Sequence, residues 1–280
     1  MLAAAANPDN LLSTIAQDIL QMMTANESLF TSMGITIYRS FALISVVWFG
    51  VETMLSGRGF HAAKFANLIM LLAFGYAMTT YYSNPIPGIG YSFSHLVTEE
   101  THSLSSQIEQ ATTGEIMTAM GTELSQMQTP SVSALLDILV PIRYFVIMFV
   151  LTGAELALVV MISFGFAAQA VCVLLGPIFI PFFIVPKLDF LFWGWLKAFL
   201  QFSFYSVVAN AYVYVFGSAL LNFWKVHNQP LTNEYAAEIF VEVVIIQMLF
   251  IFGMIKVPSL VAAIFSGSNG GFGFRVPGLS

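Results

Sequence analysis

Charged residues are scarce in this chain. Asp, Glu, Lys and Arg make up only 9% of its 280 residues, whereas 58% are hydrophobic. An average soluble domain carries roughly 25% charged residues, and a water-soluble fold this apolar would have too few polar side chains to cover its surface. The composition excludes an ordinary soluble protein and predicts a chain whose surplus apolar surface faces lipid.

Cysteine and catalytic motifs are equally sparse. The single cysteine, Cys172, excludes an intrachain disulfide. Nine Lys and Arg residues are too few for the groove of a soluble nucleic-acid-binding protein. The sequence has no nucleotide-binding fingerprint, no zinc-protease motif and no Ser-His or Cys-His arrangement at membrane depth. We therefore expect neither enzymatic activity nor a bound cofactor.

Long apolar runs are present instead. A transmembrane helix needs about 20 mostly apolar residues. Four runs each fit one crossing, at residues 35–55, 62–82, 190–221 and 239–265. The run at residues 139–185 is longer, because a straight helix of that length would measure about 70 Å. It crosses twice, or it crosses once and carries an extra piece.

Basic residues decide between these arrangements, since Lys and Arg in short loops favour the cytoplasm. Arg58 and Lys64 place the link between the first two runs inside, and hence the N-terminus outside. A single crossing by the third run puts three later basic residues inside as well, namely Lys187, Lys256 and Arg275. Two crossings would put all three outside. The sequence thus predicts an all-α polytopic membrane protein with five transmembrane helices, an outer N-terminus and an inner C-terminus.

Prolines interrupt the end of the third run. They are Pro177, Pro181 and Pro186, and Trp193 and Trp195 follow them closely. Proline removes an amide donor and clashes with the preceding turn, and freed backbone groups at membrane depth need protein or a watery cavity around them. We expect residues 176–185 to form a kinked or re-entrant piece near the cytoplasmic end of the span, packed inside an assembly. Both tryptophans are expected at the inner interface.

The outer segments carry acidic side chains and no Lys or Arg. Residues 1–34 predict an amphipathic helix that lies on the membrane or against a neighbour, and its acidic polar face favours the neighbour. Residues 83–137 predict one or two helices whose weak apolar stripe is buried against partner copies or another protein, with Glu99 and Glu100 on the partner surface. The predicted organisation is an outer segment (1–34), two spans (35–82), an outer helical loop (83–137), three spans with the Gly-Pro segment (138–265) and a flexible inner tail (266–280).

Few side chains in the sequence could carry chemistry. His95, Glu99 and His102 would share one face of a helix and are residue types that bind zinc, but we favour a solvated face of an acidic helix. Glu155 lies deepest in a span. A carboxylate there marks an ion or proton path by default. The alternative, which we favour, is a carboxylate that faces other helices and is hydrogen-bonded to them.

One stretch of the sequence resembles a known family. LLGPIFIPFFIVPKLDFLFWGWLKAF is similar to the signature region of the TrbL-like family, which are polytopic inner-membrane subunits of bacterial type IV secretion and conjugation machines. Gly176-Pro177 occupies the place of the family's Gly-Pro pair, and Trp195 that of the tryptophan opening the next span. The five spans and the large outer loop match the family's plan. The resemblance implies the bacterial inner membrane and a transfer-related role for Gly176, Pro177 and Trp195.

The resemblance also implies partners and a task. Such subunits assemble in several copies as a ring, contact pilus-forming and periplasmic subunits and cytoplasmic ATPases, and help to pass DNA or protein outward. We therefore expect a channel or platform component, whose cargo stays open. The alternatives are an accessory membrane scaffold and a small-solute or ion permease. A permease favours paired broken helices in two repeats, whereas this sequence has one broken region and no repeat.

Overall fold

The described part of the chain is almost entirely helical. The computed structural model describes residues 8–56, 60–99, 103, 115–116, 118–119, 121–122, 138–227 and 233–266. Its elements are α1 (Pro8–Leu55), α2 (Ala62–Thr80), α4 (Leu139–Phe179), the 3₁₀ helix η2 (Ile180–Ile184), α5 (Asp189–Ser203), α6 (Tyr205–Val226), α7 (Asn233–Glu238) and α8 (Phe240–Ser266). Residues 93–99 are also helical, and no strand occurs among the residues described.

Five helical segments are long and apolar enough to cross a membrane. They are Ala25–Leu55, Ala62–Thr80, Leu139–Ile184, Asp189–Val226 and Phe240–Phe265. The predicted all-α polytopic fold with five spans is confirmed. The long third run forms one span, as the basic residues indicated, because α4 continues directly into η2. The fourth span is divided at Phe204, where α5 ends and α6 begins.

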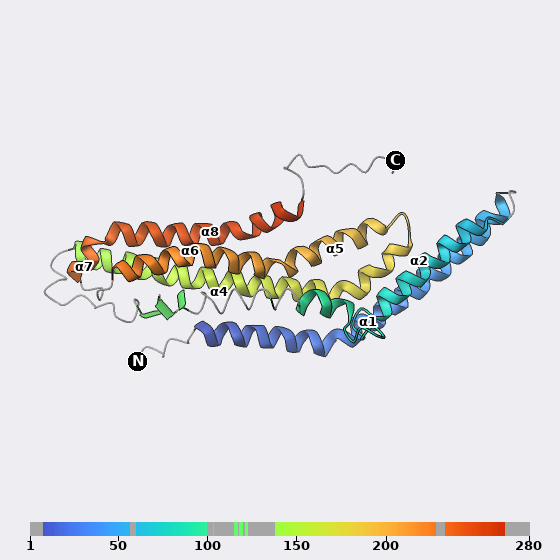
Figure 1. The fold of residues 1–280 in the computed structure, drawn as a ribbon, viewed down its shortest axis with the longest axis horizontal. Helices are drawn as coiled ribbons and strands as arrows, with labels where there is room; N and C mark the ends of the chain where they lie inside the picture. The colour runs from blue at the N-terminus through green and yellow to red at the C-terminus, as the bar shows by residue number, and fades with distance from the viewer. Residues whose placement is uncertain are drawn as a thin grey trace.

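Helix α1 is longer than the first span expected from the sequence. It runs without a break over 48 residues, so the amphipathic segment and the first span form one helix from Pro8 onward. Its first half packs along α4 (Figure 1), and Gly34 lies against Pro177. The neighbour expected for the amphipathic helix is thus another part of the same chain.

The largest apolar core lies between α4, α6 and α8. Leu151, Val213 and Val257, one from each helix, are at most 1% exposed. Ile116, from the outer loop, is fully buried in the same core and packs against Gly217. The apolar stripe of this loop was expected to be buried against partner copies or another protein. The stripe residues Leu104, Ile108, Met117, Met120, Leu124 and Met127 lie outside the described residues, so that expectation stays a prediction.

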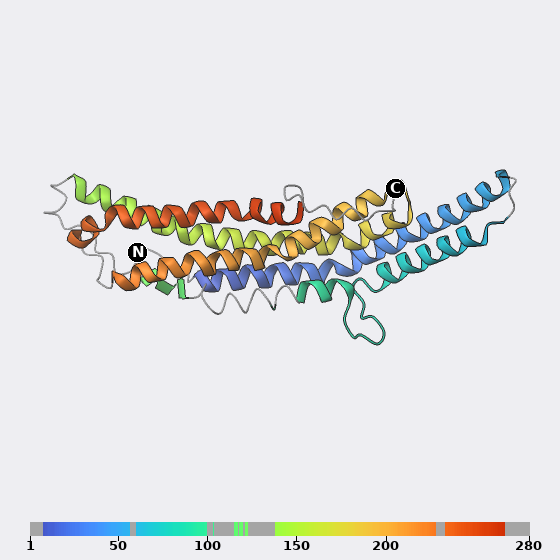
Figure 2. The same cartoon turned by 45° about the horizontal axis from the view of Figure 1, so that its top comes forward.

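Helices α1 and α2 form a hairpin that extends beyond the end of the α4–α6–α8 bundle, as both views show (Figures 1 and 2). Successive spans run in opposite directions, but the hairpin and the bundle are not level with one another. The Tyr38 hydroxyl donates to the Leu72 carbonyl at 2.7 Å within the hairpin. Trp48 and Met54 near its tip are 70% and 87% exposed. The outer faces of the hairpin are therefore open to lipid or to another molecule.

The proline-rich end of the third span is less broken than expected. The sequence predicted a kinked or re-entrant piece at residues 176–185. Helix α4 instead continues through Pro177 to Phe179, and η2 follows with Pro181 in its first turn. Proline is tolerated inside a membrane helix where other groups satisfy the backbone carbonyl that it leaves unpaired.

Candidate functional site: the Gly176-Pro177 junction

The Gly-Pro pair of α4 lies against the chain that follows α2. In an α-helix the carbonyl of residue 173 accepts a hydrogen bond from the amide of residue 177, but Pro177 has no amide hydrogen. The Tyr82 hydroxyl donates to the Val173 carbonyl instead, at 2.9 Å. Burial raises the pKa of the Tyr82 phenol, so the hydroxyl keeps its proton. Tyr82 therefore compensates the backbone defect that Pro177 creates.

Two glycines make this close approach possible. A Cβ atom at position 176 would overlap the Tyr82 ring, and a Cβ atom at position 34 would overlap the Pro177 carbonyl. Small residues at helix contacts allow backbones to approach closely. Gly176 and Gly34 thus let α1 and the segment after α2 pack directly on α4 at the proline.

Trp195 covers the junction from α5. Its indole N–H donates to the Cys172 carbonyl at 2.9 Å. The indole ring stacks on Phe199 with the two planes 4° apart and lies edge-on to Tyr82. Because Trp195 is only 6% exposed, its expected place at the inner membrane interface is wrong. Trp193 is 53% exposed and is the tryptophan of this pair that faces outward.

The junction lies near the end of the third span that leads to Lys187, as expected, but it is not level with the hairpin tip that carries Lys64. The sequence placed Gly176 and Pro177 on the cytoplasmic side, together with Lys64 in the link between α1 and α2. Tyr82 follows the opposite end of α2. The hydrogen bond between Tyr82 and Val173 therefore sets the junction level with the end of the hairpin that is remote from Lys64.

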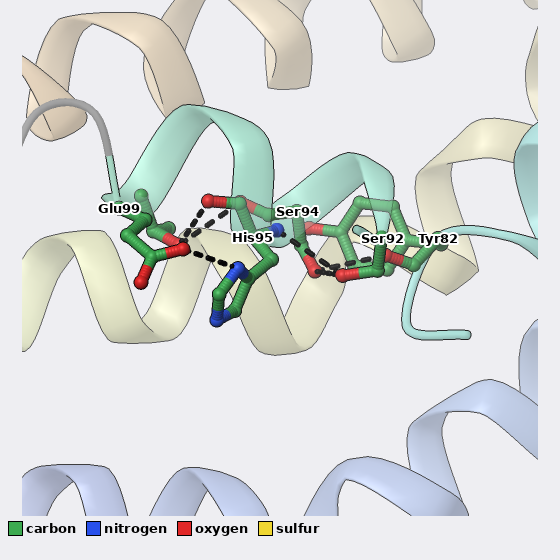
Figure 3. Close-up of polar contacts among 6 residues, drawn as sticks. Tyr82, Ser92, Ser94, His95 and Glu99 are labelled. Carbon is green, nitrogen blue, oxygen red and sulfur yellow. Dashed lines mark hydrogen bonds and ion pairs between the residues drawn. The ribbon is translucent and has the colours of Figure 1, made fainter. Parts of the chain in front are cut away.

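A polar cluster continues from Tyr82 along the chain (Figure 3). The Ser94 hydroxyl donates to the Tyr82 carbonyl at 2.8 Å and lies 3.3 Å from the Ser92 hydroxyl. The Ser92 hydroxyl accepts the His95 amide. One turn later, His95 Nδ1 lies 2.7 Å from the Glu99 carboxylate. These contacts fix the start of the helix at residues 93–99 beside the junction.

A cavity of about 350 Å³ adjoins the junction. Side chains from α1, from α4 and from the segment after α2 line it. Its apolar lining is Met23, Phe30, Val173, Leu174 and Pro177, and its polar lining is Glu27, Tyr82, Ser83, Ser92, Ser94, His95 and Thr98. The cavity thus has both apolar and polar lining, with one carboxylate among the polar groups.

Of the three candidate metal ligands, only His95 and Glu99 lie among the described residues. His95 and Glu99 pair as their helical spacing predicts, with side chains 52% and 59% exposed. His102 and Glu100 lie outside the described residues. Within the part of the chain that is described, no three His, Cys, Asp or Glu side chains are arranged to hold a metal ion. The exposure of His95 and Glu99 fits the solvated face of an acidic helix.

The carboxylates near the spans lie in different surroundings. Glu52 pairs with Lys64 at 3.2 Å near the hairpin tip, and Glu242 lies 3.4 Å from His227 at the other end of the bundle. Glu155 is half-buried on α4. Its carboxylate makes no hydrogen bond or ion pair to the other residues described. The favoured interpretation, a carboxylate that faces other helices and is hydrogen-bonded to them, and the alternative of an ion or proton path both stay predictions.

Sequence reasoning missed Tyr82 and Gly34. One signal was available, since a proline at position 177 leaves the carbonyl of residue 173 in need of a donor. Tyr81 and Tyr82, at the end of a predicted span, are suitable donors. Neither hydropathy nor spacing states which donor reaches which carbonyl across 91 residues.

A Tyr82→Phe variant tests the hydroxyl alone. The ring would keep its packing, but the buried Val173 carbonyl would lose its donor. We expect a loss of about 1–3 kcal/mol in the free energy of unfolding, the cost of an unsatisfied buried group. Thermal unfolding of the purified protein in detergent measures the effect. Tyr81→Phe is the matched control and should change stability by less than about 0.5 kcal/mol, and equal effects in the two variants would contradict the role of Tyr82.

Comparison with known proteins places the junction within a family match. A family model described as TrbL/VirB6 plasmid conjugal transfer protein matches residues 42–257. The match covers well over half of the chain and includes Gly176, Pro177 and Trp195. No curated protein matches the chain.

Proposed function

The chain belongs to the TrbL/VirB6 family of plasmid conjugal transfer proteins, and on that premise we propose that it is an inner-membrane channel or platform subunit of a type IV secretion machine. The family makes it a multi-pass membrane component of conjugation. The finer proposal is that it supports pilus assembly and the passage of DNA or protein substrate. The family match is the observation that carries this function.

The proposed orientation places the N-terminus in the periplasm and the C-terminus in the cytoplasm. Lys64, near the hairpin tip, and Lys187, in the turn between η2 and α5, lie at ends of spans that point the same way (Figures 1 and 2). Lys225 lies at the opposite end, in the last turn of α6. Basic residues in short loops favour the cytoplasmic side of the membrane, and two of these three lysines, Lys64 and Lys187, support this orientation.

The proposed partners are other copies in a ring, periplasmic and pilus-forming subunits, and cytoplasmic secretion ATPases. Apolar side chains such as Phe149 on α4 and Phe252 on α8 are 80% and 60% exposed. Part of this surface faces lipid, and part is available for subunit contacts. In this proposal Gly176, Pro177 and Trp195 hold the shape of the subunit that transfer needs, and Glu99 with Glu100 belongs to the periplasmic partner surface.

Charge reversal tests the periplasmic surface. The double variant Glu99→Lys with Glu100→Lys should lower recovery of periplasmic subunits severalfold, because like charges across an interface are strongly unfavourable. The number of spans should not change. Glu238→Lys on α7 is the control for an added positive charge at an exposed position. Unchanged recovery with the double variant would contradict the proposal that this surface is a platform for periplasmic subunits.

The whole proposal is tested by affinity purification of the tagged full chain from its native membranes in mild detergent, followed by mass spectrometry. Co-purification of secretion ATPases and pilus subunits, with several copies of the bait, is the expected result. Recovery of the chain alone, under conditions that keep other membrane complexes intact, would contradict a machine subunit. It would favour a permease, with Glu155 as the residue to substitute next.

A further inference from the structure

The cavity beside the Gly176-Pro177 junction holds a carboxylate without a counter-charge. Glu27 on α1 lines the cavity and makes no hydrogen bond or ion pair to the other residues described. Among the described residues that line the cavity there is no Lys or Arg. The sequence also has none in residues 1–38 or 65–142, the stretches that supply Glu27 and the segment after α2. A positive group at Glu27 must therefore come from a more distant part of the chain or from another molecule.

The polar groups around this carboxylate are hydrogen-bond acceptors. The hydroxyls of Tyr82, Ser94 and Thr98 donate their hydrogens to the backbone carbonyls of residues 173, 82 and 94. His95 Nδ1 carries the hydrogen that faces the Glu99 carboxylate, so Nε2 of the neutral ring is an acceptor. The lone pairs of these groups are what remains for a ligand. They fit a cation with N–H donors, whereas a phosphate would meet only acceptors and a like charge.

Lys197 on α5 is a lysine without a counter-charge. It is exposed and makes no hydrogen bond or ion pair to the other residues described. It lies in Asp189–Val226, a segment long and apolar enough to cross a membrane, and charged side chains in such segments are usually paired. Lys197 follows Trp195 by two residues, a rotation of about 200° around the helix. It therefore points away from the Cys172 carbonyl to which Trp195 donates.

The position of Glu27 along the bundle follows from two contacts of α1 with the third span. Gly34 lies against Pro177. Further along both segments, Phe41 contacts Phe182, so α1 runs in the same direction as α4 and η2. Glu27 precedes Gly34 by two turns of helix, and the corresponding position on α4 is about residue 170.

Lys197 lies at the same level. Trp195 of α5 bonds residue 172 of α4. Phe202, later in α5, contacts Phe164, which is earlier in α4, so these two helices run in opposite directions. Because Lys197 follows Trp195 by two residues, the corresponding position on α4 is again about residue 170. The unpaired lysine and the unpaired carboxylate are thus level with one another along the bundle.

The two groups lie on different faces of the molecule. Helices α1 and α5 both pack on α4, and near the junction α4 lies between them (Figure 1). Copies related by rotation about an axis parallel to the bundle keep their residues at equal heights. The α5 face of one copy can therefore meet the α1 face of the next at the level of both charges. Contact between two different faces is the heterologous kind that closes a ring.

We infer that Lys197 of one copy inserts its ammonium into the cavity of the neighbouring copy and pairs there with Glu27. This inference rests on the ring of copies in the proposed function and names the two faces that meet in that ring. Each copy supplies one ammonium and one carboxylate, so a closed ring leaves neither charge unpaired. The lone pairs of His95 Nε2 and of the Tyr82 hydroxyl are acceptors for the remaining N–H groups.

A carbodiimide, which joins a carboxylate to an amine when the two are in contact, tests the pair in native membranes. The full chain should give a covalent dimer, and mass spectrometry of the dimer should find a link between Glu27 and Lys197. Glu27→Gln and Lys197→Arg should each lower the amount of dimer at least fivefold. Asp18→Asn on α1 and Lys187→Arg before α5 change exposed residues and should leave it unchanged.

Exchange of the two charges tests the contact without a reagent. Glu27→Lys and Lys197→Glu should each lower the yield of multi-copy complexes at least fivefold, because like charges then meet across the interface. The variant with both changes should restore the yield to within twofold of the wild type. Native mass spectrometry in mild detergent measures the yield. A substitution that only damaged folding would not be rescued by the second one.

Four results would overturn the inference. Multi-copy complexes of the wild type without a link between Glu27 and Lys197 would leave the ring standing and remove this contact from it. The same link within a monomer would make the pair intrachain, and a link from Glu27 to a lysine of another protein would assign the cavity to that partner. Absence of rescue by the double exchange would contradict the pairing. Recovery of the wild type as a monomer alone would contradict the ring itself, and the inference with it.

Discussion

A Gly176→Ala variant is expected to lose about 3 kcal/mol of stability, toward the upper end of the cost of overpacking a well-packed core. The added Cβ atom would overlap the Tyr82 ring. That ring cannot move aside cheaply, because its hydroxyl holds the Val173 carbonyl and because Phe93 and Trp195 enclose it. Thermal unfolding in detergent should show a midpoint lower by about 8 °C.

Two glycines serve as controls for this substitution. Gly50 and Gly194 are also helical, but an added Cβ would meet nothing within 4 Å at either position. Alanine at these positions should be neutral or stabilise the helix by up to about 1 kcal/mol. If the Gly176→Ala variant unfolds at the same temperature as the two control variants, the close packing of Gly176 on Tyr82 is wrong.

A double variant identifies the cause of the loss. Tyr82→Ala removes the ring that the new Cβ would overlap, so Gly176→Ala should be much less damaging in that background than in the wild type. The coupling between two contacting residues in such a cycle is typically 0.5–3 kcal/mol. Purely additive effects would place the strain of Gly176→Ala elsewhere in α4.

A Trp195→Ala variant is expected to destabilise the protein by about 3–5 kcal/mol, the usual cost of deleting a buried tryptophan side chain. The substitution empties the space between Tyr82 and Phe199 and takes away the indole donor of the Cys172 carbonyl. Membrane insertion should persist, because the span that α5 and α6 form stays apolar. Substrate transfer should fall much more than the amount of inserted protein.

Variants of Trp193 and Trp195 distinguish a role in packing from a role in membrane anchoring. Trp193→Ala removes a ring that is 53% exposed and should change stability by about 0.5 kcal/mol or less. Trp195→Phe keeps the ring stack but loses the N–H donor, so its cost should lie between those of the two alanine variants. Normal transfer by a stably inserted Trp195→Ala variant would refute a role for this residue in the machine.

The sequence was a good guide to the spans. Hydropathy and the basic residues led to five crossings and to a single long third span, because long apolar runs and loop charges are local properties of the chain. The family signature led to Gly176, Pro177 and Trp195, which the structure brings together around Tyr82. The agreement ends where contacts between distant segments decide the arrangement.

Three features could not be predicted for this reason. The burial of Trp195 depends on the Cys172 carbonyl, 23 residues away, as an acceptor. The level of the junction depends on how far the hairpin extends past the bundle, which hydropathy does not encode. The cavity next to Glu27 exists because α1 continues past the expected start of the first span and packs along α4.

The hydrogen bond between Tyr82 and Val173 has a consequence for biogenesis. It joins residues 91 positions apart, so it forms only after most of the third span has been synthesised. By then the α1–α2 hairpin has already been synthesised. Contacts within the hairpin, such as Tyr38 with Leu72 and Glu52 with Lys64, stabilise it. The hairpin can enter the bilayer on its own, whereas the junction is completed afterwards, when Trp195 and the rest of α5 follow. Assembly of this subunit is therefore sequential: the Val173 carbonyl, which Pro177 leaves without an amide donor, is bonded by a tyrosine that was inserted earlier.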